Sequence, residues 1–262
     1  MRAWLDANPL PEAPLRGLWT GEGVYETLLW RGVPPPGWPL HVARMREGAA
    51  RLGLPLPEEE TLLRAAQAVG PGLWRLRLTW LAVGGAWTEA PQRASLLCEA
   101  RGVTPGELAP PPARLVLGGC VRNPASRLAG CKRTGIAEDL VWRRQAERAG
   151  ADDTLLRSVD GWLSEASTST LLCGLDDGSL ASPGPDAAPV LGTTLAQLQN
   201  RLPIAPLRLT AGDLGRIRWA LLLNAVVGAR AVAVIEDQVL DPPPAELCDL
   251  ARATTGWPEF RG

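Results

Sequence analysis

The spacing of apolar and polar positions predicts a chain that contains both strands and helices. Residues 23–30 (GVYETLLW) form a short apolar run, and residues 74–83 (WRLRLTWLAV) alternate with the strand period. Residues 40–53 and 57–70 carry apolar side chains at helical spacing, and each ends at a glycine that favours a helix stop. Further strands are predicted at 94–100, 113–119, 153–158, 161–165, 169–174, 205–210, 219–225 and 229–236, and further helices at 137–150, at 193–201 and after 242–244.

A stretch rich in proline and glycine divides these elements into two groups. Residues 101–112 (RGVTPGELAPPP) have no apolar period, so they are the best candidate for a linker. The pattern predicts an α+β protein with a smaller N-terminal α/β domain at 1–105, an interdomain linker at 106–113 and a larger strand-rich C-terminal domain at 114–262. In such a protein the cleft between the domains is the expected ligand site.

Composition and charge narrow the possible partners. Of the 262 residues, 46% are hydrophobic and 21% are charged, which is typical of a folded globular protein. The formal net charge of −1 offers no basic field to nucleic acid or to an anionic membrane. The N-terminal sequence MRAWLDANPLPEAP lacks the apolar core of a signal peptide, and the apolar stretch 219–235 is too short and too polar to span a bilayer. We therefore expect a cytoplasmic protein that acts on a small molecule.

The inventory of cysteine and histidine argues against several kinds of site. The five cysteines are scattered without a CxxC spacing, which disfavours a disulfide framework and a zinc site. His41 is the lone histidine, which makes a histidine-rich metal site or a Ser-His-Asp triad improbable. We therefore expect no metal site.

The basic residues include a single lysine, whose chemistry differs from that of arginine. Of 27 basic residues, 26 are arginine, and the single lysine is Lys132. Arginine stays charged and is a poor amine nucleophile, whereas a desolvated lysine loses its proton and forms a Schiff base. A compositional bias that replaces exchangeable lysines by arginine would retain a lysine with such a role. Composition alone is equally compatible with chance retention.

Three further features could bind a charged ligand. Glu165 lies in a strand-like segment within GWLSEASTST (161–170), where a buried carboxylate would need a cationic partner. The segment LGTTL (191–195) precedes a helical pattern and offers N–H groups and hydroxyls to a phosphate. Arg44, on the first predicted helix, could supply a guanidinium to a phosphate. Each has an ordinary alternative, namely a solvated strand-end glutamate, a plain helix cap and a solvated helix arginine.

In their order along the chain, these motifs resemble the fold-type IV pyridoxal-phosphate (PLP) enzymes. That family includes the branched-chain and D-amino-acid aminotransferases and 4-amino-4-deoxychorismate lyase. The resemblance covers nearly the whole chain and is carried by GEGVYETL, LHVARMREGAARLG, AGCKRTG, ADDTLLRSVDGWLSEASTSTLL, PVLGTTLAQL and LLLNAVVGARAVAVI. The AGxK context of Lys132 and the NAVVGARAVAVI segment are most similar to the lyase branch.

The resemblance implies a two-domain fold-type IV enzyme with PLP in the cleft between its domains, and a role for each matching residue. Lys132 would be the Schiff-base anchor and proton shuttle, and Glu165 would pair with the pyridine nitrogen. The cofactor-binding residues implied by the resemblance are Arg44, Lys132, Glu165, Gly192, Thr193, Thr194, Asn224 and Ala225. The substrate side would include Tyr25, Glu26, Thr27 and Trp87. Members of the family are usually homodimers, so a second copy of the chain is the expected partner.

The lyase branch implies a specific reaction. Lys132 would take the proton from the amine-bearing carbon of 4-amino-4-deoxychorismate, pyruvate would be released, and 4-aminobenzoate would remain for folate biosynthesis. A branched-chain or D-amino-acid aminotransferase on the same fold is the first alternative. A non-catalytic relative that retains the fold is the second.

The chain departs from the family pattern at places that concern the substrate. The residues after Lys132 read RTGIA, without the tyrosine or asparagine that commonly follows, and Thr170 replaces a family asparagine. The loop 82–89 (AVGGAWTE) carries Trp87 and no arginine for a substrate carboxylate. Other candidate cations are Arg75, Arg77, Arg93 and Arg133, although a solvated outer face is the expected environment of the first two.

Overall fold

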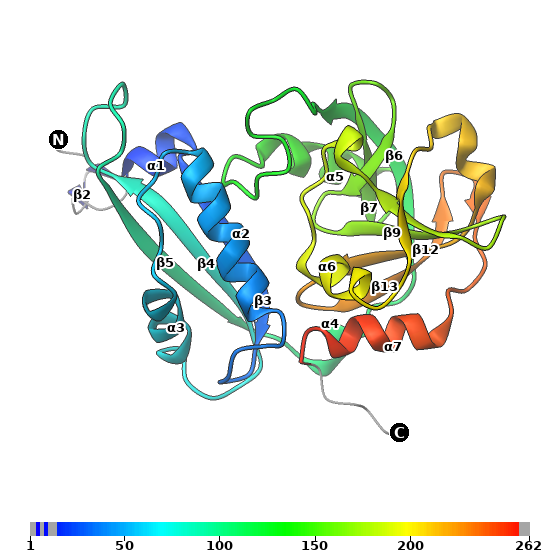
Figure 1. The fold of residues 1–262 in the computed structure, drawn as a ribbon, viewed down its shortest axis with the longest axis horizontal. Coiled ribbons are helices and arrows are strands. Elements are labelled where there is room, and N and C mark those ends of the chain that lie inside the picture. The colour runs from blue at the N-terminus through cyan, green and yellow to red at the C-terminus, as the bar shows by residue number, and fades with distance from the viewer. Residues whose placement is uncertain (1–3, 6–7, 10–14, 257–262) are drawn as a thin grey trace. The chain divides into compact units, whose positions relative to one another are not determined.

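A computed structural model describes residues 4–5, 8–9 and 15–256, which form two compact units (Figure 1). Unit 1 comprises Met1–Pro34, Trp38–Gly102 and Cys131–Ile136, and unit 2 comprises Pro35–Gly37, Val103–Gly130 and Ala137–Gly262. The change of unit near residue 102 lies close to the expected linker. The segment that holds Lys132 differs from the expectation, because residues 131–136 belong to unit 1 rather than to the C-terminal part.

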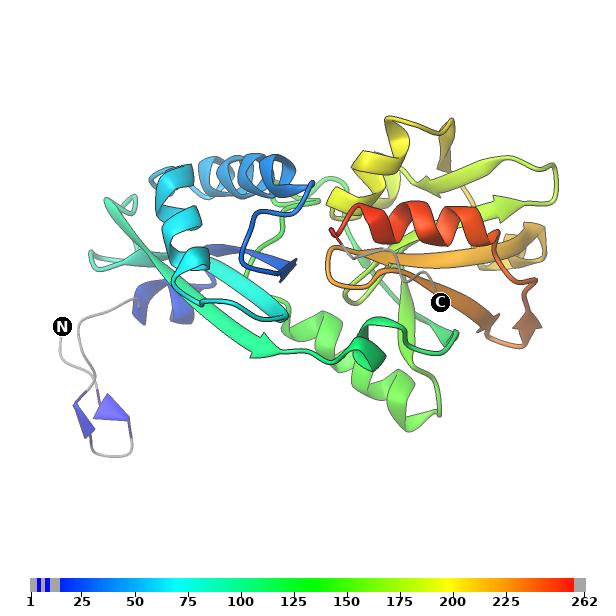
Figure 2. The ribbon, with the colours of Figure 1, turned by 90° about the horizontal axis from the view of Figure 1, so that it is seen from below.

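Unit 1 is a three-stranded antiparallel sheet in the order β3-β4-β5, with helices on both sides. Its elements are β1 (Trp4–Leu5), β2 (Asn8–Pro9), α1 (Leu15–Thr20), β3 (Gly23–Trp30), α2 (Trp38–Arg51), α3 (Glu59–Gln67), β4 (Trp74–Val83) and β5 (Arg93–Gly102). Helices α2 and α3 cover one face of the sheet, and α1 lies on the other side (Figure 2). We call the side of the sheet away from α2 the open face.

The alternation of β3 sorts its side chains between these two faces. Val24, Glu26 and Leu28 are buried beneath α2, whereas Tyr25 and Thr27 belong to the open face. The register places Tyr25 opposite Thr79 and Thr27 opposite Arg77 on β4. Neighbouring residues of the GVYETLLW motif therefore meet different surroundings.

Main-chain pairing along the free edge of β3 explains why the Lys132 segment belongs to unit 1. The N–H of Tyr25 donates to the carbonyl of Lys132 at 3.1 Å, and the N–H of Thr134 donates to the carbonyl of Gly23 at 2.9 Å. A β-bridge joins Val24 to Arg133 between these two bonds. The segment thus acts as a short additional strand, and it satisfies edge groups that would otherwise be exposed.

Unit 2 is built on a sheet that contains nine strands among the described residues. The order is β11-β10-β9-β12-β13-β6-β7-β8, and β14 pairs with β13. Its elements are α4 (Pro105–Leu108), β6 (Ala113–Arg122), α5 (Ala137–Arg148), β7 (Asp153–Ser158), β8 (Leu163–Ala166), β9 (Thr170–Leu175), β10 (Leu180–Pro183), η1 (Pro185–Ala187), α6 (Thr193–Gln199), β11 (Ile204–Leu207), η2 (Ala211–Arg216), β12 (Ile217–Asn224), β13 (Gly228–Ile235), β14 (Gln238–Val239) and α7 (Ala245–Ala253).

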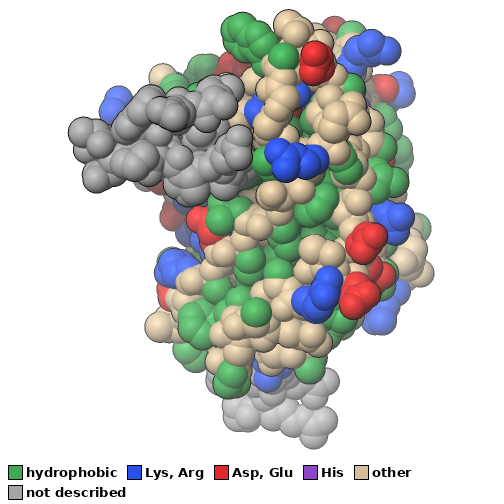
Figure 3. All heavy atoms as spheres, turned by 90° about the vertical axis from the view of Figure 1, so that its left-hand side faces the viewer, with side chains coloured by type: hydrophobic (Ala, Val, Ile, Leu, Met, Phe, Trp, Pro, Cys, Tyr) green, Lys and Arg blue, Asp and Glu red, His purple; other side chains and the backbone are tan. Residues whose placement is uncertain are grey.

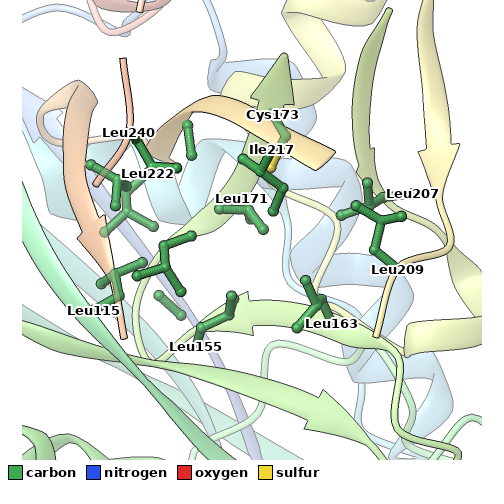
Figure 4. Close-up of a cluster of buried hydrophobic side chains, with 14 of the residues drawn as sticks. Leu115, Leu155, Leu163, Leu171, Cys173, Leu207, Leu209, Ile217, Leu222 and Leu240 are labelled. Carbon is green, nitrogen blue, oxygen red and sulfur yellow. The ribbon is translucent and has the colours of Figure 1, made fainter. Parts of the chain in front are cut away.

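Both faces of the central strands are buried, which explains their almost continuous apolar runs. Leu171 and Leu222 point into one cluster, which Figure 4 shows enclosed by the strands. The alternating residues Leu172 and Leu223 pack instead in a second cluster that includes residues of α6 and α7. A fully buried leucine stabilises the fold by about 2 kcal/mol relative to an exposed one, so these strands anchor unit 2.

The predicted strands and helices are confirmed, with ends displaced by a few residues. The pattern missed the short elements β1, β2, α1, β10, η1, η2 and β14, and it missed α4 inside the expected linker. That turn of helix has local causes: Thr104 and Glu107 form a capping box and Pro105 occupies the first turn. Within residues 15–256, every helix is too short or too polar to cross a membrane.

Candidate functional site

The predicted site residues are divided between the two units, and each group is described within its own unit. Unit 1 holds Tyr25, Glu26, Thr27, Arg44, Trp87 and Lys132. Unit 2 holds Glu165, Gly192, Thr193, Thr194, Asn224 and Ala225.

In unit 1, the amine of Lys132 lies against the ring of Tyr25. The Nζ atom is 4.5 Å from the ring centroid, and the Cζ atom of Arg77 is 3.8 Å from the same centroid. The ring is buried, the lysine is half-buried, and the main-chain pairing with β3 holds both in register. The chain's only lysine, its only tyrosine and a β4 arginine therefore form one cluster, in which each cation lies close to the aromatic ring.

Beneath α2, on the opposite face of β3, lies a second cluster that contains the lone histidine. The Nε of Arg44 donates to Oε1 of Glu26 at 2.8 Å, and a terminal nitrogen donates to Oε2 at 2.5 Å. Nδ1 of His41 lies 2.6 Å from Oε2 of the same carboxylate. Arg44 is thus an ion-pair partner of Glu26, and the two hydrogen bonds to this carboxylate set the direction of its guanidinium.

The charge states of this second cluster follow from burial and pairing. Burial raises the pKa of Glu26, but Arg44 and His41 outweigh burial and lower the pKa to about 2. Burial also lowers the pKa of His41 below its ordinary value. The contact with Glu26 raises this pKa, whereas the positive charges of Arg44 and Lys132 lower it further. At neutral pH the carboxylate is an acceptor only, so the neutral imidazole donates to it through Nδ1.

The other substrate-side candidates in unit 1 lie apart from Glu26. Thr27 is half-buried on the open face, opposite Arg77. Trp87 is 77% exposed, on the loop between β4 and β5. That loop is fixed by the buried guanidinium of Arg16, which donates to the carbonyls of Ala86 at 2.9 Å and Glu89 at 2.6 Å. The structure therefore groups Tyr25 and Thr27 on one face and places Glu26 on the other.

Of the four candidate cations for a substrate carboxylate, Arg77 is the one whose side chain lies over the Tyr25 ring. Its side chain is 34% exposed and stacks on Tyr25, and Arg75 shares its strand face as the alternation predicts. Arg133 is exposed on the edge segment, and Arg93 is exposed at the start of β5. Arg77 was expected on a solvated outer face, but the Tyr25 ring covers one side of its guanidinium, so the side chain is only partly exposed to solvent.

In unit 2, Glu165 on β8 is a buried and paired carboxylate. The Nε of Arg122 donates to its Oε1 at 2.9 Å, and the N–H of Val190 donates to its Oε2 at 3.1 Å. The two terminal nitrogens of Arg122 donate to Asp139 at 2.8 and 3.1 Å. Burial lowers the pKa of Arg122, but Glu165 and Asp139 outweigh burial and raise it, so the guanidinium remains charged.

The Gly192–Thr194 segment at the start of α6 contains a buried hydroxyl without a partner. Among the described residues, Oγ1 of Thr194 makes no hydrogen bond, although the residue is only 1% exposed. An unpaired buried hydroxyl costs about 1–3 kcal/mol, so a ligand oxygen that accepts from it would recover this cost. A Cβ at Gly192 would lie 2.4 Å from Oγ1 of Thr170, which explains the glycine there. The segment fits an anionic group.

The turn after β12 is held by the side chain of Asn224. Its Oδ1 accepts from the N–H groups of Val226 at 3.0 Å and Val227 at 2.9 Å, and its Nδ2 donates to Oγ of Ser169 at 3.1 Å. Ala225 lies within this turn and is half-buried. Asn224 therefore shapes the turn through its side chain.

Sequence reasoning missed the partners that determine these side-chain positions. His41 entered the argument only against a metal site and a Ser-His-Asp triad. The predicted strand 113–119 ended before Arg122, and Asp139 was only part of the predicted helix 137–150. Their partners lie 15 to 43 residues away along the chain, so no local spacing connects them. Within the described residues, no group of three His, Cys, Asp or Glu side chains is placed to hold a metal ion.

Comparisons with known proteins agree with the fold and with the motifs. The sequence model of the amino-transferase class IV family matches residues 23–235. A hypothetical aminotransferase from Mycobacterium tuberculosis in its PLP-bound form is 22% identical with a TM-score of 0.80, over 96% of this chain and 95% of that chain. The 4-amino-4-deoxychorismate lyase from Pseudomonas aeruginosa is 28% identical with a TM-score of 0.76, over 95% and 97%.

A third similar structure belongs to a different branch. The branched-chain amino acid aminotransferase from Escherichia coli is 14% identical with a TM-score of 0.79, over 97% of this chain and 93% of that chain. A comparison with curated protein sequences gives no match. The family match confirms the resemblance inferred from the motifs, the α+β two-domain fold and the cofactor. The chain therefore belongs to the class IV aminotransferase family and is a PLP-dependent enzyme.

Proposed function

We propose that the chain is a 4-amino-4-deoxychorismate lyase, which releases pyruvate and leaves 4-aminobenzoate for folate synthesis in the cytoplasm. The observation that carries the proposal is the cluster of Lys132, Tyr25 and Arg77, in which an amine and a guanidinium lie on one aromatic ring. The 28% identity to the Pseudomonas aeruginosa lyase over almost the whole of both chains supports this branch.

Each cofactor-binding residue implied by the resemblance would have its own role toward PLP. Lys132 would hold PLP covalently through its amine, and Glu165 would accept a hydrogen bond from the ring nitrogen. The phosphate would accept from the hydroxyl of Thr194, which has no partner among the described residues. Gly192, Thr193 and the turn shaped by Asn224 would surround the phosphate, with the turn residue Ala225 beside it. Arg44 would contribute positive charge, in an orientation fixed by its two hydrogen bonds to Glu26. When bound, PLP supplies an electron sink for a carbanion at the amine-bearing carbon.

The chain's own residues would then move protons and orient the substrate. Once the substrate amine has replaced it on the cofactor, the released amine of Lys132 would take the proton from the amine-bearing carbon, and the electron pair freed there would cleave the ether bond to the enolpyruvyl group. The departing enolpyruvate takes a proton and becomes pyruvate, while the ring becomes aromatic. Arg77 would bind a substrate carboxylate, since a guanidinium pairs with a carboxylate through two parallel hydrogen bonds. Tyr25 would hold the side chains of Lys132 and Arg77 in place through its ring.

The experiment compares the lyase reaction with amino transfer in the same preparation. Purified protein saturated with PLP is given 4-amino-4-deoxychorismate, and pyruvate and 4-aminobenzoate are quantified. Parallel samples receive branched-chain L-amino acids or D-amino acids, and conversion of the cofactor to its amine form is followed by its spectrum. Equal molar yields of pyruvate and 4-aminobenzoate support the lyase. Amino transfer without pyruvate release assigns the aminotransferase alternative.

Two controls connect the result to the anchor residue. Lys132→Ala is expected to lose the visible band of bound PLP and all turnover, and borohydride reduction of the wild type should attach the cofactor to Lys132. Lys132→Arg keeps the positive charge, but a guanidinium forms no Schiff base and does not give up its proton near neutral pH, so this variant should be equally inactive. A wild type that binds no PLP at saturating concentration would support the non-catalytic relative instead.

We also propose that the protein is a homodimer. Unit 1 exposes several large apolar side chains, among them Leu18, Trp19 and Trp87. Hydrophobic side chains gather along the middle of the surface in Figure 3, and charged groups lie around and between them. Exposed apolar patches of this kind mark interaction sites. Light scattering of the purified protein should give twice the mass of one chain, and a monomer at micromolar concentration would contradict the proposal.

A further inference from the structure

The carboxylate of Glu165 is one member of a charge cluster that spans three elements of unit 2. Arg122 ends β6, Asp139 lies in the first turn of α5, and Glu165 lies on β8. Both acidic residues are buried, and the arginine side chain is only 19% exposed. Arg122 donates through Nε to Glu165 and through both terminal nitrogens to Asp139, so a single guanidinium serves two carboxylates.

This division of the guanidinium affects how strongly Glu165 attracts a proton. The charges of the three side chains sum to minus one, in a region where charges interact more strongly than in water. Asp139 receives two of the three hydrogen bonds from Arg122, and its negative charge offsets much of the positive potential at Glu165. Glu165 consequently remains a stronger base than a carboxylate paired with an arginine of its own.

The same contacts fix where the carboxylate points. Arg122 donates to Oε1 and the N–H of Val190, in the loop before α6, donates to Oε2, so each oxygen has a donor from a different segment of the chain. A carboxylate oxygen accepts from more than one donor, which leaves lone pairs on both atoms for a further group. Arg122 and Val190, which lie outside the sequence motif that contains Glu165, therefore set the orientation of its carboxylate.

We propose that Arg122 and Asp139 are positioning residues that set how firmly Glu165 holds a proton on the ring nitrogen of the cofactor. This inference rests on the proposed role of Glu165 toward PLP. Arg122 orients the carboxylate, and Asp139 keeps that carboxylate basic by sharing the guanidinium. The pair thereby adjusts the electron-withdrawing strength of the ring, without contact with the substrate.

The test removes the charge of Asp139 and measures the ring nitrogen itself. The holoenzyme is reconstituted with PLP carrying ¹⁵N in the ring, and the nitrogen chemical shift is followed against pH. In Asp139→Asn the guanidinium acts mainly on Glu165, so the midpoint of ring-nitrogen deprotonation should fall by about one pH unit. Asp139→Ser removes the same charge with a smaller side chain, and it should give the same displacement if the amide variant folds poorly.

Two further variants separate this inference from the proposed function. Glu138→Gln removes one charge from the adjacent, exposed position of α5 and should leave the midpoint unchanged. Glu165→Gln should lower the midpoint more than either Asp139 variant does. A wild-type midpoint in both Asp139 variants, together with a displaced midpoint in Glu165→Gln, overturns the inference and leaves the role of Glu165 intact. A wild-type midpoint in Glu165→Gln as well overturns both.

Discussion

The Nζ atom of Lys132 lies 4.5 Å from the centroid of the Tyr25 ring, and the main chains of these two residues are hydrogen-bonded at 3.1 Å. Two contacts therefore position the Lys132 amine. One is the main-chain pairing of its segment with the edge of β3, and the other is the contact of Nζ with the Tyr25 ring. Pairing along β3 leaves the Lys132 backbone little freedom to change direction, while its long side chain keeps the reach needed to move a proton. The same ring holds Arg77 at 3.8 Å.

Replacement of Arg77 should weaken substrate binding. Arg77→Met keeps an apolar stem against Tyr25 but removes the guanidinium, so we expect KM to rise about 10- to 100-fold with a smaller change in kcat. Arg75→Met removes the same charge from the same strand face and is the matched control, for which we expect less than a twofold change. Steady-state kinetics with 4-amino-4-deoxychorismate measure both. Equal effects of the two variants would indicate a general loss of positive charge rather than a specific contact.

Replacement of Thr194 should separate protein stability from cofactor affinity. Thr194→Val keeps the shape of the side chain and removes a buried hydroxyl that has no partner among the described residues. The free energy of unfolding of the apoprotein should therefore stay the same or rise by up to about 1 kcal/mol. The Kd for PLP should increase about tenfold, because the phosphate loses a donor. Urea unfolding and a spectral titration with PLP measure the two quantities, and an unchanged Kd would remove Thr194 from the phosphate site.

Glu26 should make stability depend on pH in the acidic range. Its pKa is lowered from 4.5 to about 2 in the folded state, so its stabilising contribution is present above pH 4.5 and is lost as the pH falls toward 2. This displacement corresponds to about 3 kcal/mol. Glu26→Gln should lose about that amount at pH 7 and should show a flatter pH dependence between pH 5 and pH 2. Urea unfolding at several pH values checks both expectations.

The control for Glu26 is an exposed glutamate in the same unit. Glu60 on α3 forms a solvent-exposed pair with Arg64, so Glu60→Gln should change the free energy of unfolding by less than about 1 kcal/mol at every pH. If Glu26→Gln behaves like this control, the buried cluster under α2 does not stabilise the fold as inferred.

Gly228 should tolerate no side chain. It begins β13 with φ of +78°, and a Cβ there would lie 2.6 Å from the Cα of Arg252 on α7. Gly228→Ala should therefore destabilise unit 2 by about 3 kcal/mol or more, through both backbone strain and a collision with main-chain atoms. Gly178 has φ of +82° and open space around it, so Gly178→Ala should cost only about 1 kcal/mol. Thermal unfolding of both variants distinguishes strain alone from strain with a collision.

Much of the fold follows from local patterns that the sequence displays directly. The helices α2 and α5 and the strands β4 and β12 were predictable because the 3.6- and 2-residue periods record which side chains each element buries. The family was predictable because several motifs, including those that contain Lys132 and Glu165, occur in a fixed order. The short helix α4 was missed although its Thr104 and Glu107 signal is local, because the proline-rich context was read as a linker.

The surroundings of the site residues could not be predicted in this way. Adjacent residues Tyr25 and Glu26 lie on opposite faces of β3 and both are buried, and only the packing of α2 decides that Glu26 meets Arg44 and His41. Arg44 was expected to be available to a phosphate, and its pairing with Glu26 depends on how α2 lies on the sheet.

The sequence by itself determined the class of fold, the order of its elements and the identity of the one lysine that can serve as an anchor. Tertiary structure alone decided that Lys132 joins unit 1 along the edge of β3, that Arg77 shares the Tyr25 ring, and that Arg122 divides its charge between Glu165 and Asp139. The reason is physical. Periodicity is set by neighbours a few residues apart, whereas ion pairs and ring contacts join side chains that meet only after strands and helices have packed.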